Sequence, residues 1–266
     1  MRGLNEKVAI VTGGSRGIGY ACVKRLLEEG TKVLFNGRSE ENGKKALQQF
    51  KLKYKDVFFI SGDMSDEDFC IKTIKTALDI FGKLDFLVNN AFPFTAKGLN
   101  ASRQDWLHTM ASGPIAYATM IQHYVKLRGK DTPGAIVNMS SISGHIAQPD
   151  RWTYNAAKGA VIQLTRCAAM DLAPKIRVNT LSPGWVWTDE VEKATHGQGR
   201  EKWEPIWGKF HLNRRLGEPE EVASVVAFLL SDDAILITGA DIYADGGYLA
   251  MGSEGLGESS SFAGSV

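Results

Sequence analysis

Cysteine is scarce in this sequence of 266 residues, and the thiols that it has are widely separated. Cys22, Cys70 and Cys167 form no Cys-x-x-Cys pair, and each stands among apolar residues in a helix-like stretch. Isolated cysteines in such surroundings are ordinarily buried free thiols. We therefore expect no disulfide and no metal site.

Long hydrophobic runs and an excess of charge of one sign are also missing. A stretch of about 18 uncharged apolar residues, which a membrane helix needs, does not occur, and the beginning of the chain lacks the apolar region of a secretion signal. A net charge of +1 gives no overall basic field of the kind that attracts nucleic acid or anionic membranes. These absences favour a cytosolic protein whose partner is a small molecule.

Short apolar segments rich in Val, Ile, Leu and Phe alternate with amphipathic helical patterns along most of the chain. This alternation is typical of repeated βαβ units that build a parallel sheet covered on both faces. The sequence thus predicts an α/β fold, a single-domain Rossmann-type doubly wound parallel sheet of about seven strands flanked by helices. The predicted strands are 7–12, 32–36, 57–61, 84–89, 135–140, 177–182 and 240–244, and the predicted helices are 17–29, 40–54, 66–81, 102–128, 153–172 and 218–230.

No linker rich in Pro and Ser interrupts this alternation, so we expect residues 1–251 to form one domain. The segment 185–215 breaks the rhythm and carries several tryptophans. A loop of that length in a compact domain is usually functional, and we interpret it as a lid over the substrate. Residues 252–266 are rich in Gly and Ser, which indicates a flexible tail, ordered at most against another subunit.

Tyr154 and Lys158 are four residues apart in a predicted helix, and Ser141 precedes them after the strand 135–140. Side chains at i and i+4 share one face of a helix. A phenol beside an ammonium can exchange a proton with a carbonyl oxygen near neutral pH, which hydride transfer requires. A Tyr-x-x-x-Lys match alone is more often a surface tyrosine and lysine. Together with Ser141 and a glycine-rich opening, the pair indicates an oxidoreductase with these three residues at its centre.

Glycines stand where the first strand turns into the first helix, in the segment Thr12–Gly19. At such a turn the backbone approaches a pyrophosphate, and the helix N-terminus offers free N–H groups and a positive dipole. The expected contacts are Gly13, Gly17 and Gly19. A tight connection without a ligand is the alternative, but the strand before the turn and the helix after it favour nucleotide binding.

The second strand is followed by Arg38, where an NAD site would place an acid to accept from the ribose 2'-hydroxyl. Arg38, with Ser15 and Arg16, would instead hold a 2'-phosphate through charge-assisted hydrogen bonds, which predicts NADP(H). The alternative is that Arg38 is a solvated loop charge. Asp63, after the third strand, would accept from the adenine amino group or cap the helix that begins near Asp66.

With these residues the chain resembles the short-chain dehydrogenase/reductase family from about Lys7 to Tyr248. The turn resembles the family's T-G-x-x-x-G-x-G, Asn89-Asn90-Ala91 its N-N-A, and Ser141, Tyr154 and Lys158 its catalytic residues. The resemblance implies that Ser141 polarises the carbonyl and that Tyr154 is the general acid or base. It also implies that Lys158 binds the nicotinamide ribose and lowers the pKa of Tyr154.

The same resemblance implies further cofactor contacts. Asn89 would pack beside the adenosine ribose, Pro183 and Gly184 would form the turn on the nicotinamide side, and Val186 and Thr188 would hold the carboxamide. We also assign three neighbouring residues to the predicted cofactor site, namely Ile18, Met64 and Ala91.

Two positions depart from the family pattern. Phe92 stands where the family usually has glycine after N-N-A, and glycine there tolerates a positive φ and a close approach of the backbone. We expect the altered loop to line the substrate pocket with aromatic rings. The catalytic asparagine of the family is missing near Ser112-Gly113-Pro114, so either Ser112 replaces it in the proton relay or the relay differs. Pro114 should open the helical hydrogen bonding nearby.

The predicted substrate site consists of Phe92, Phe94, His145, Trp152 and Trp185. Aromatic surfaces and polar donors together favour a small cyclic or polyhydroxylated secondary alcohol and its ketone. Packing of the tryptophans in the core or in an oligomer interface is the alternative for each of them. A 3-oxoacyl thioester reductase is a second interpretation, and a dinucleotide-binding sensor or scaffold without turnover is a third of a different class.

The predicted helices 102–128 and 153–172 carry apolar residues on more than one face, and such helices need two partners. The residues are Met110, Ile115, Met120 and Ile121 on the first helix and Val161, Ile162 and Leu164 on the second. By the family resemblance we expect a homo-oligomer, a dimer or tetramer.

Overall fold

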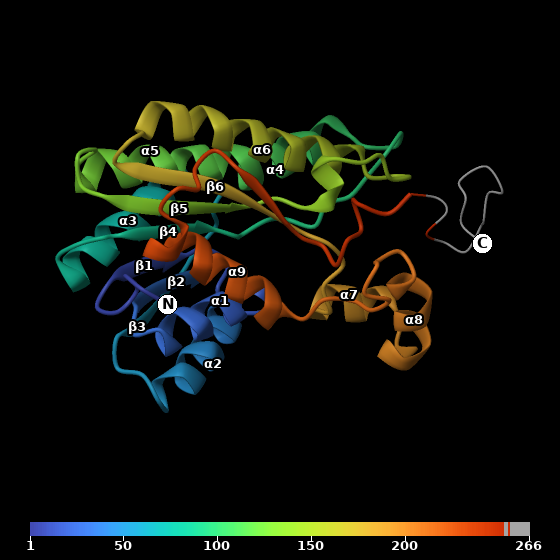
Figure 1. The fold of residues 1–266 in the computed structure, drawn as a ribbon, viewed down its shortest axis with the longest axis horizontal. Helices are drawn as coiled ribbons and strands as arrows, with labels where there is room; N and C mark the ends of the chain where they lie inside the picture. The colour runs from blue at the N-terminus through green and yellow to red at the C-terminus, as the bar shows by residue number, and fades with distance from the viewer. Residues whose placement is uncertain (253–254, 256–266) are drawn as a thin grey trace.

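The computed structural model describes residues 1–252 and 255, and in that part of the chain seven parallel strands form one sheet in the order β3-β2-β1-β4-β5-β6-β7 (Figure 1). The order changes direction between β1 and β4, as in a doubly wound sheet. The predicted fold class is therefore confirmed. The strands are β1 (Val8–Val11), β2 (Lys32–Gly37), β3 (Val57–Ser61), β4 (Phe86–Asn89), β5 (Gly134–Met139), β6 (Ile176–Pro183) and β7 (Asp241–Ala244). The predicted tail, apart from 252 and 255, lies outside the described residues.

Helices cover both faces of the sheet, because each parallel connection must cross from one end of a strand to the other. On one face lie α1 (Gly17–Glu28), α2 (Glu40–Lys51) and α9 (Pro219–Leu230), and on the other lie α3 (Glu67–Phe81), α5 (Ala116–Arg128) and α6 (Trp152–Leu172) (Figure 1). Two shorter helices, α7 (Asp189–Ala194) and α8 (Gly199–Gly208), lie together beyond the layers.

Alternation along the strands divides the core into two layers. Successive side chains of a strand point to opposite faces, so neighbouring residues belong to different clusters. Ile10, Leu34, Leu87, Ile136 and Val178 pack with α3, α5 and α6, while Val11, Phe35, Val88, Val137 and Leu181 pack with α1, α2 and α9. The sheet is thus a fixed platform whose strand ends can hold a site.

The predicted helix 102–128 is interrupted. It begins as α4 (Arg103–Met110), passes through a π-helical turn at Ala111–Ile115 and continues as α5. Pro114 lies inside that turn and lacks the N–H group that a regular helix needs, and Gly113 takes a non-helical conformation. The opening of the helix expected from Pro114 is confirmed, and it places Ser112 in the widened turn.

The predicted long loop at 185–215 is wrong, because two helices occupy much of it. Glu190 stands in the acidic first turn of α7, where carboxylates favour a helix start. The rings of Trp203 and Trp207 stack with centroids 4.7 Å apart, and the Trp185 ring lies 5.2 Å from that of Trp207. The tryptophans therefore pack chiefly on one another, which holds the segment in a definite shape.

The expectation that all three cysteines are buried needs correction. Cys22 and Cys70 are buried, but Cys167 is exposed because it points away from the face of α6 that packs on the sheet. Among the apolar residues noted on the two long predicted helices, four are buried within this subunit, namely Met120, Ile121, Val161 and Ile162. Ile115 is 56% exposed, so it remains available to a partner.

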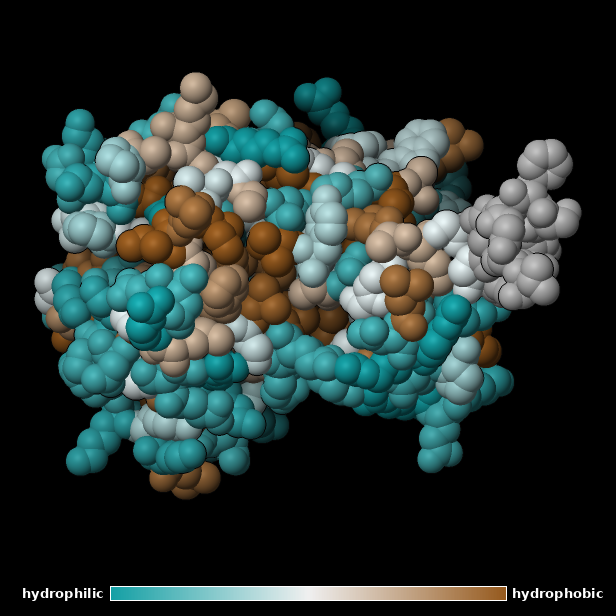
Figure 2. Space-filling model, in the orientation of Figure 1, coloured by the Kyte–Doolittle hydropathy of each residue, from teal (hydrophilic) through white to brown (hydrophobic). Residues whose placement is uncertain are grey.

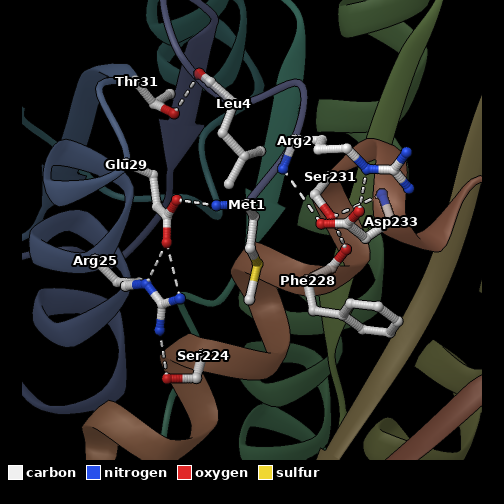
Figure 3. A network of polar contacts seen from close by, with 10 residues as sticks. All are labelled: Met1, Arg2, Leu4, Arg25, Glu29, Thr31, Ser224, Phe228, Ser231 and Asp233. Carbon is white, nitrogen blue, oxygen red and sulfur yellow. Dashed lines mark hydrogen bonds and ion pairs between the residues drawn. The ribbon is translucent and has the colours of Figure 1, made fainter.

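Polar contacts near the N-terminus join α1 to α9 (Figure 3). Glu29 accepts hydrogen bonds from the Met1 amino group and from Arg25 Nε, and Arg25 Nη1 donates to Ser224 of α9 at 2.6 Å. Arg2 pairs with Asp233, which follows α9, at 2.6 Å. These contacts help to fix α1, whose N-terminal end faces the cleft described below.

Hydrophobic residues gather along the sheet edge that β7 forms, while hydrophilic residues cover the outer helices (Figure 2). Near that edge Leu236 is 94% exposed and Tyr243 is 52% exposed. Within the described part of the chain, no helix combines the length and hydrophobicity of a membrane span. Among the same residues, no cluster of three or more His, Cys, Asp or Glu side chains is arranged to hold a metal ion.

Candidate active site

A cleft of about 690 Å³ opens where the carboxyl ends of the strands meet. Loops that follow β1, β2, β3, β4, β5 and β6 all contribute to its lining. In open α/β sheets this edge, at the change of strand order, is the usual place for a ligand. The cleft therefore lies where the sequence motifs converge.

The glycine turn after β1 forms the floor of the cleft. Gly13 and Gly17 have positive φ, which glycine adopts without strain. A Cβ on Gly19 would lie 2.1 Å from Gly13 O, so the turn has room for no larger residue there. Thr12 Oγ1 accepts hydrogen bonds from the N–H groups of Asn90 and Ala91 at 2.9 and 3.0 Å, which joins this turn to the loop after β4.

One end of the cleft is lined by polar residues that follow β1, β2 and β3. Ser15, Arg38, Asp63 and Met64 line it, and Arg38 forms no ion pair with any described residue. Arg16 also lines it, but its guanidinium pairs with Glu190 of α7 at 2.7 Å. Arg38 is therefore the available cation at this end.

Asp63 does not cap the helix that follows it. Its carboxylate accepts from the N–H and the hydroxyl of Ser65, both at 2.9 Å. Asp66 caps α3 instead, because its side chain accepts from the N–H of Asp68. Of the two interpretations of Asp63, the cap is wrong, and the carboxylate faces the cleft.

Ser141 and Tyr154 line the opposite end. Ser141 Oγ accepts from the N–H of Ser143 at 3.1 Å, which fixes its side chain at the end of β5. Burial raises the pKa of the Tyr154 phenol, while the Ser141 hydroxyl and the positive charge of Arg151 act in the opposite direction. Tyr154 is therefore a neutral phenol near pH 7, the form that donates a proton.

Lys158 lies behind Tyr154 and is only 2% exposed, so it does not line the cleft. Its Nζ donates to Met139 O at 2.9 Å and lies 3.6 Å from the centroid of the Phe92 ring. Burial lowers the pKa of Lys158 to about 7. The four-residue spacing places Lys158 and Tyr154 on the same face of α6, and the fold adds the Phe92 ring, which covers the Lys158 ammonium.

Aromatic rings and Arg151 form the remaining wall. Phe92, Phe94 and Trp185 line the cleft as predicted for a substrate site, and Trp207 joins them. The Phe94 ring lies 5.2 Å from that of Tyr154.

His145 and Trp152, also predicted for the substrate site, do not line this cleft. His145 Nε2 lies 2.7 Å from Asp241 Oδ2 of β7. Trp152 is 54% exposed, because residues two apart on a helix, such as Trp152 and Tyr154, point in different directions.

The turn after β6 closes the cleft on the side of α1. Gly184, Val186 and Thr188 line it, whereas Pro183 is the buried last residue of β6. A Cβ on Gly17 would lie 3.5 Å from Thr188 Cγ2, so the two turns approach closely.

Asn89 does not reach the cleft. It is fully buried in β4, and its Nδ2 donates to Asn138 Oδ1 at 2.9 Å. Asn90, one residue later, lines the cleft and donates to Thr12 O. Adjacent residues of an extended segment point in opposite directions, so Asn90, and not Asn89, lines the cleft.

The lining fits a dinucleotide. The N-terminus of α1 has no side-chain cap, so its N–H groups remain open to an anion, and Arg38 supplies a positive charge on the same side. From this anion site the cleft extends to Tyr154. Gly13, Gly17, Ile18, Gly19 and Ala91 line the part in between.

Comparison with known proteins agrees with this geometry. Residues 13–249 match the family model described as enoyl-(acyl carrier protein) reductase. The chain belongs to the short-chain dehydrogenase/reductase family. Over 93% of its length it is 35% identical to 98% of the NADP-dependent (R)-specific alcohol dehydrogenase of Lentilactobacillus kefiri.

Other relatives cover the chain equally well. It is 36% identical, over 91% of its length, to 97% of the 3-oxoacyl-(acyl-carrier-protein) reductase FabG of Staphylococcus aureus. It is 32% identical, over 93% of its length, to 98% of the cyclopentanol dehydrogenase of Comamonas testosteroni. The solved structure of the aldohexose dehydrogenase of Thermoplasma acidophilum superimposes with a TM-score of 0.85 at 31% identity, covering 94% of this chain and 96% of that one.

The two departures from the short-chain dehydrogenase/reductase pattern meet in space. A Cβ on Gly113 would lie 2.6 Å from Phe92 Cε2, so the Phe92 ring occupies the space that the glycine of the π-helical turn leaves free. Beside it, Ser112 is 7% exposed and lines the cleft. Its hydroxyl has no hydrogen-bond partner among the described residues, and a buried polar group normally has one.

Sequence reasoning missed some residues of the wall, including Asn90 and Ile142, and it offered Trp207 only as one of several tryptophans of the lid. Asn90 belongs to the N-N-A motif, and strand alternation beyond Asn89 was a usable signal. Trp207 comes from α8, far along the chain, and no local pattern places it beside Trp185.

Proposed function

We propose that this oxidoreductase of the short-chain dehydrogenase/reductase family uses NADP(H) to interconvert a secondary alcohol and a ketone on a small cyclic or polyhydroxylated substrate. The observation that carries this proposal is the joint presence of Ser141 and Tyr154 at one end of a cleft whose other end has the uncapped N-terminus of α1.

Each catalytic residue has a role that its surroundings permit. When bound, the nicotinamide supplies or accepts the hydride. Tyr154, kept neutral by burial, gives its proton to the carbonyl oxygen, and Ser141 donates a hydrogen bond to the same oxygen. Lys158 favours the phenolate that Tyr154 leaves behind, because an ammonium nearby lowers the pKa of a phenol.

Ser112 takes the place of the missing asparagine in the proton relay. Ser112 lines the cleft, and its buried hydroxyl neither donates to nor accepts from any described residue, so a small movement of the side chain would let it hold a water molecule. Ser112→Ala should then reduce turnover without changing NADPH affinity, whereas unchanged turnover would assign the relay to other groups.

The preference for NADP(H) rests on Arg38. Arg38, and not an acid, stands directly after β2, and an unpaired guanidinium on the lining suits a 2'-phosphate. The named cofactor of the Lentilactobacillus kefiri relative is also NADP. Kinetics with both cofactors test this, because equal or better use of NADH would contradict it.

The substrate class rests on the wall that faces Tyr154. Phe94, Trp185 and Trp207 offer flat apolar surfaces, and Gln148 and Arg151 offer polar donors. The relatives named for cyclopentanol and for aldohexose support a small cyclic or polyhydroxylated substrate. The predicted lid role of 185–215 is a further proposal, and slower hydrogen exchange in α7 and α8 on addition of NADPH would support it.

The decisive experiment measures NADPH oxidation with cyclic ketones, keto sugars, oxosteroids and 3-oxoacyl thioesters. Tyr154→Phe should lower kcat/KM by at least about 100-fold, since it removes the proton donor. Tyr243→Phe is the matched control, because Tyr243 lies on β7 outside the cleft. Tight NADPH binding without turnover of any ketone would favour the dinucleotide-binding sensor.

A 3-oxoacyl thioester reductase is the second candidate, favoured by the 36% identity to FabG. It predicts that 3-oxoacyl thioesters surpass every cyclic ketone in kcat/KM.

We also propose a dimer or tetramer, supported by exposed apolar residues on the helices of one layer, such as Leu107, Ile115 and Met170. A monomeric mass by light scattering would refute it.

A further inference from the structure

Arg151 is the cation at the substrate end of the cleft. It immediately precedes α6, three residues before Tyr154, and lines the cleft with it. Its guanidinium carbon lies 5.6 Å from the centroid of the Phe94 ring and 5.7 Å from that of the Trp185 ring. Two aromatic rings therefore flank the charge.

The Arg151 side chain has no protein partner in the described part of the chain, since it forms neither an ion pair nor a side-chain hydrogen bond there. Arg16, by contrast, is paired with Glu190. A guanidinium near aromatic rings keeps its N–H donors in its own plane, where they remain free for a ligand.

Acidic residues of the lining lie elsewhere. Glu190 is paired with Arg16 at 2.7 Å and Lys193 at 3.1 Å. Asp189 also lies beside Arg16, in a shallow depression that borders α7. The third acid of the lining, Asp63, follows β3 at the other end of the cleft. No carboxylate of the lining therefore pairs with Arg151, whose positive charge acts on Tyr154.

We propose that the substrate carries a carboxylate, which Arg151 binds while the ring of the substrate lies against Phe94, Trp185 and Trp207. This inference rests on the proposed function and narrows it to small cyclic oxo acids and the corresponding hydroxy acids. A carboxylate matches a single guanidinium through two parallel hydrogen bonds, whereas a phosphate dianion would leave charge unpaired here.

The test compares two ketones that differ in charge and little in shape, 4-oxocyclohexanecarboxylate and 4-oxocyclohexanecarboxamide. In the wild type, kcat/KM for the acid should exceed that for the amide by about 10- to 100-fold, as a charge-assisted contact would give. Arg151→Gln should bring the ratio close to one. Arg103→Gln removes an equal charge from the exposed start of α4 and should preserve the wild-type ratio.

A binding measurement separates this inference from the proposed function. NADPH-loaded protein is titrated calorimetrically with cyclohexanecarboxylate, cyclohexanecarboxamide and cyclohexyl phosphate. Preference for the carboxylate that is lost in Arg151→Gln supports the inference even if neither these two ketones nor any ketone of the panel described above is reduced, in which case the proposed function fails. Turnover of both ketones with an acid-to-amide ratio of kcat/KM near one leaves the proposed function standing and overturns the inference. Tighter binding of cyclohexyl phosphate than of cyclohexanecarboxylate also overturns the inference.

Discussion

The Phe92 ring covers the Lys158 ammonium, and removing the ring should change how the protein exchanges protons when it binds its cofactor. Burial lowers the pKa of Lys158 to about 7, and the Phe92 ring lies 3.6 Å from its Nζ. In Phe92→Ala, water would reach the ammonium from the cleft. The pKa of Lys158 should then rise toward the ordinary value of about 10.4.

The expected proton uptake on NADPH binding follows from the pKa of Lys158. At pH 8, one unit above a pKa of about 7, about nine tenths of free wild-type molecules carry a neutral Lys158. The anionic cofactor favours the charged amine, so NADPH binding should take up about 0.9 proton. In Phe92→Ala the amine is already charged at pH 8, and uptake should fall to about zero.

Isothermal titration of NADPH at pH 8 in two buffers of different ionisation enthalpy measures this number directly. Phe94→Ala is the matched control, because the Phe94 ring contacts the ring of Tyr154 and not Lys158. The control should retain wild-type uptake. Equal uptake in wild type and Phe92→Ala would refute the reasoning, and so would the absence of uptake in the wild type.

Three further substitutions test the geometry of the cleft. Gly113→Ala would place a Cβ 2.6 Å from the Phe92 ring. Displacing this packed ring should lower the free energy of unfolding, measured by denaturant titration, by about 1–3 kcal/mol, and an unchanged free energy would mean that the ring moves aside without cost. Gly19→Ala would place a Cβ 2.1 Å from Gly13 O, so NADPH affinity measured by fluorescence should fall by at least about tenfold if the turn holds the pyrophosphate. His145→Ala should leave kcat/KM for ketones within about twofold, since His145 faces Asp241 and not the cleft, and a large loss would return it to the substrate site.

Local patterns were sufficient to predict the sheet and to single out the residues proposed for the central chemistry. Continuous apolar segments predicted the ends of every strand to within two residues, because a strand buried on both faces is made almost entirely of apolar residues. Glycines at Gly13 and Gly17 were recognisable because the turn requires positive φ there. Tyr154 and Lys158 share a helix face for a geometric reason that depends on spacing alone.

Contacts between segments that are far apart in the sequence could not be predicted from local patterns. Three contacts join residues that are far apart in the sequence: Arg16 pairs with Glu190, His145 contacts Asp241, and Trp207 approaches Trp185. Their directions depend on how the helices pack.

The sequence by itself determined the order of strands and helices and the glycine turn after β1, and it pointed to Tyr154 as the proposed proton donor, because each of these depends on residue types a few positions apart. The tertiary structure decided that Asn90 rather than Asn89 faces the cleft, that Phe92 covers Lys158, and that Arg151 stands free between two rings. These features depend on which side chains from remote parts of the chain fill the same space, and burial then sets the pKa of Lys158.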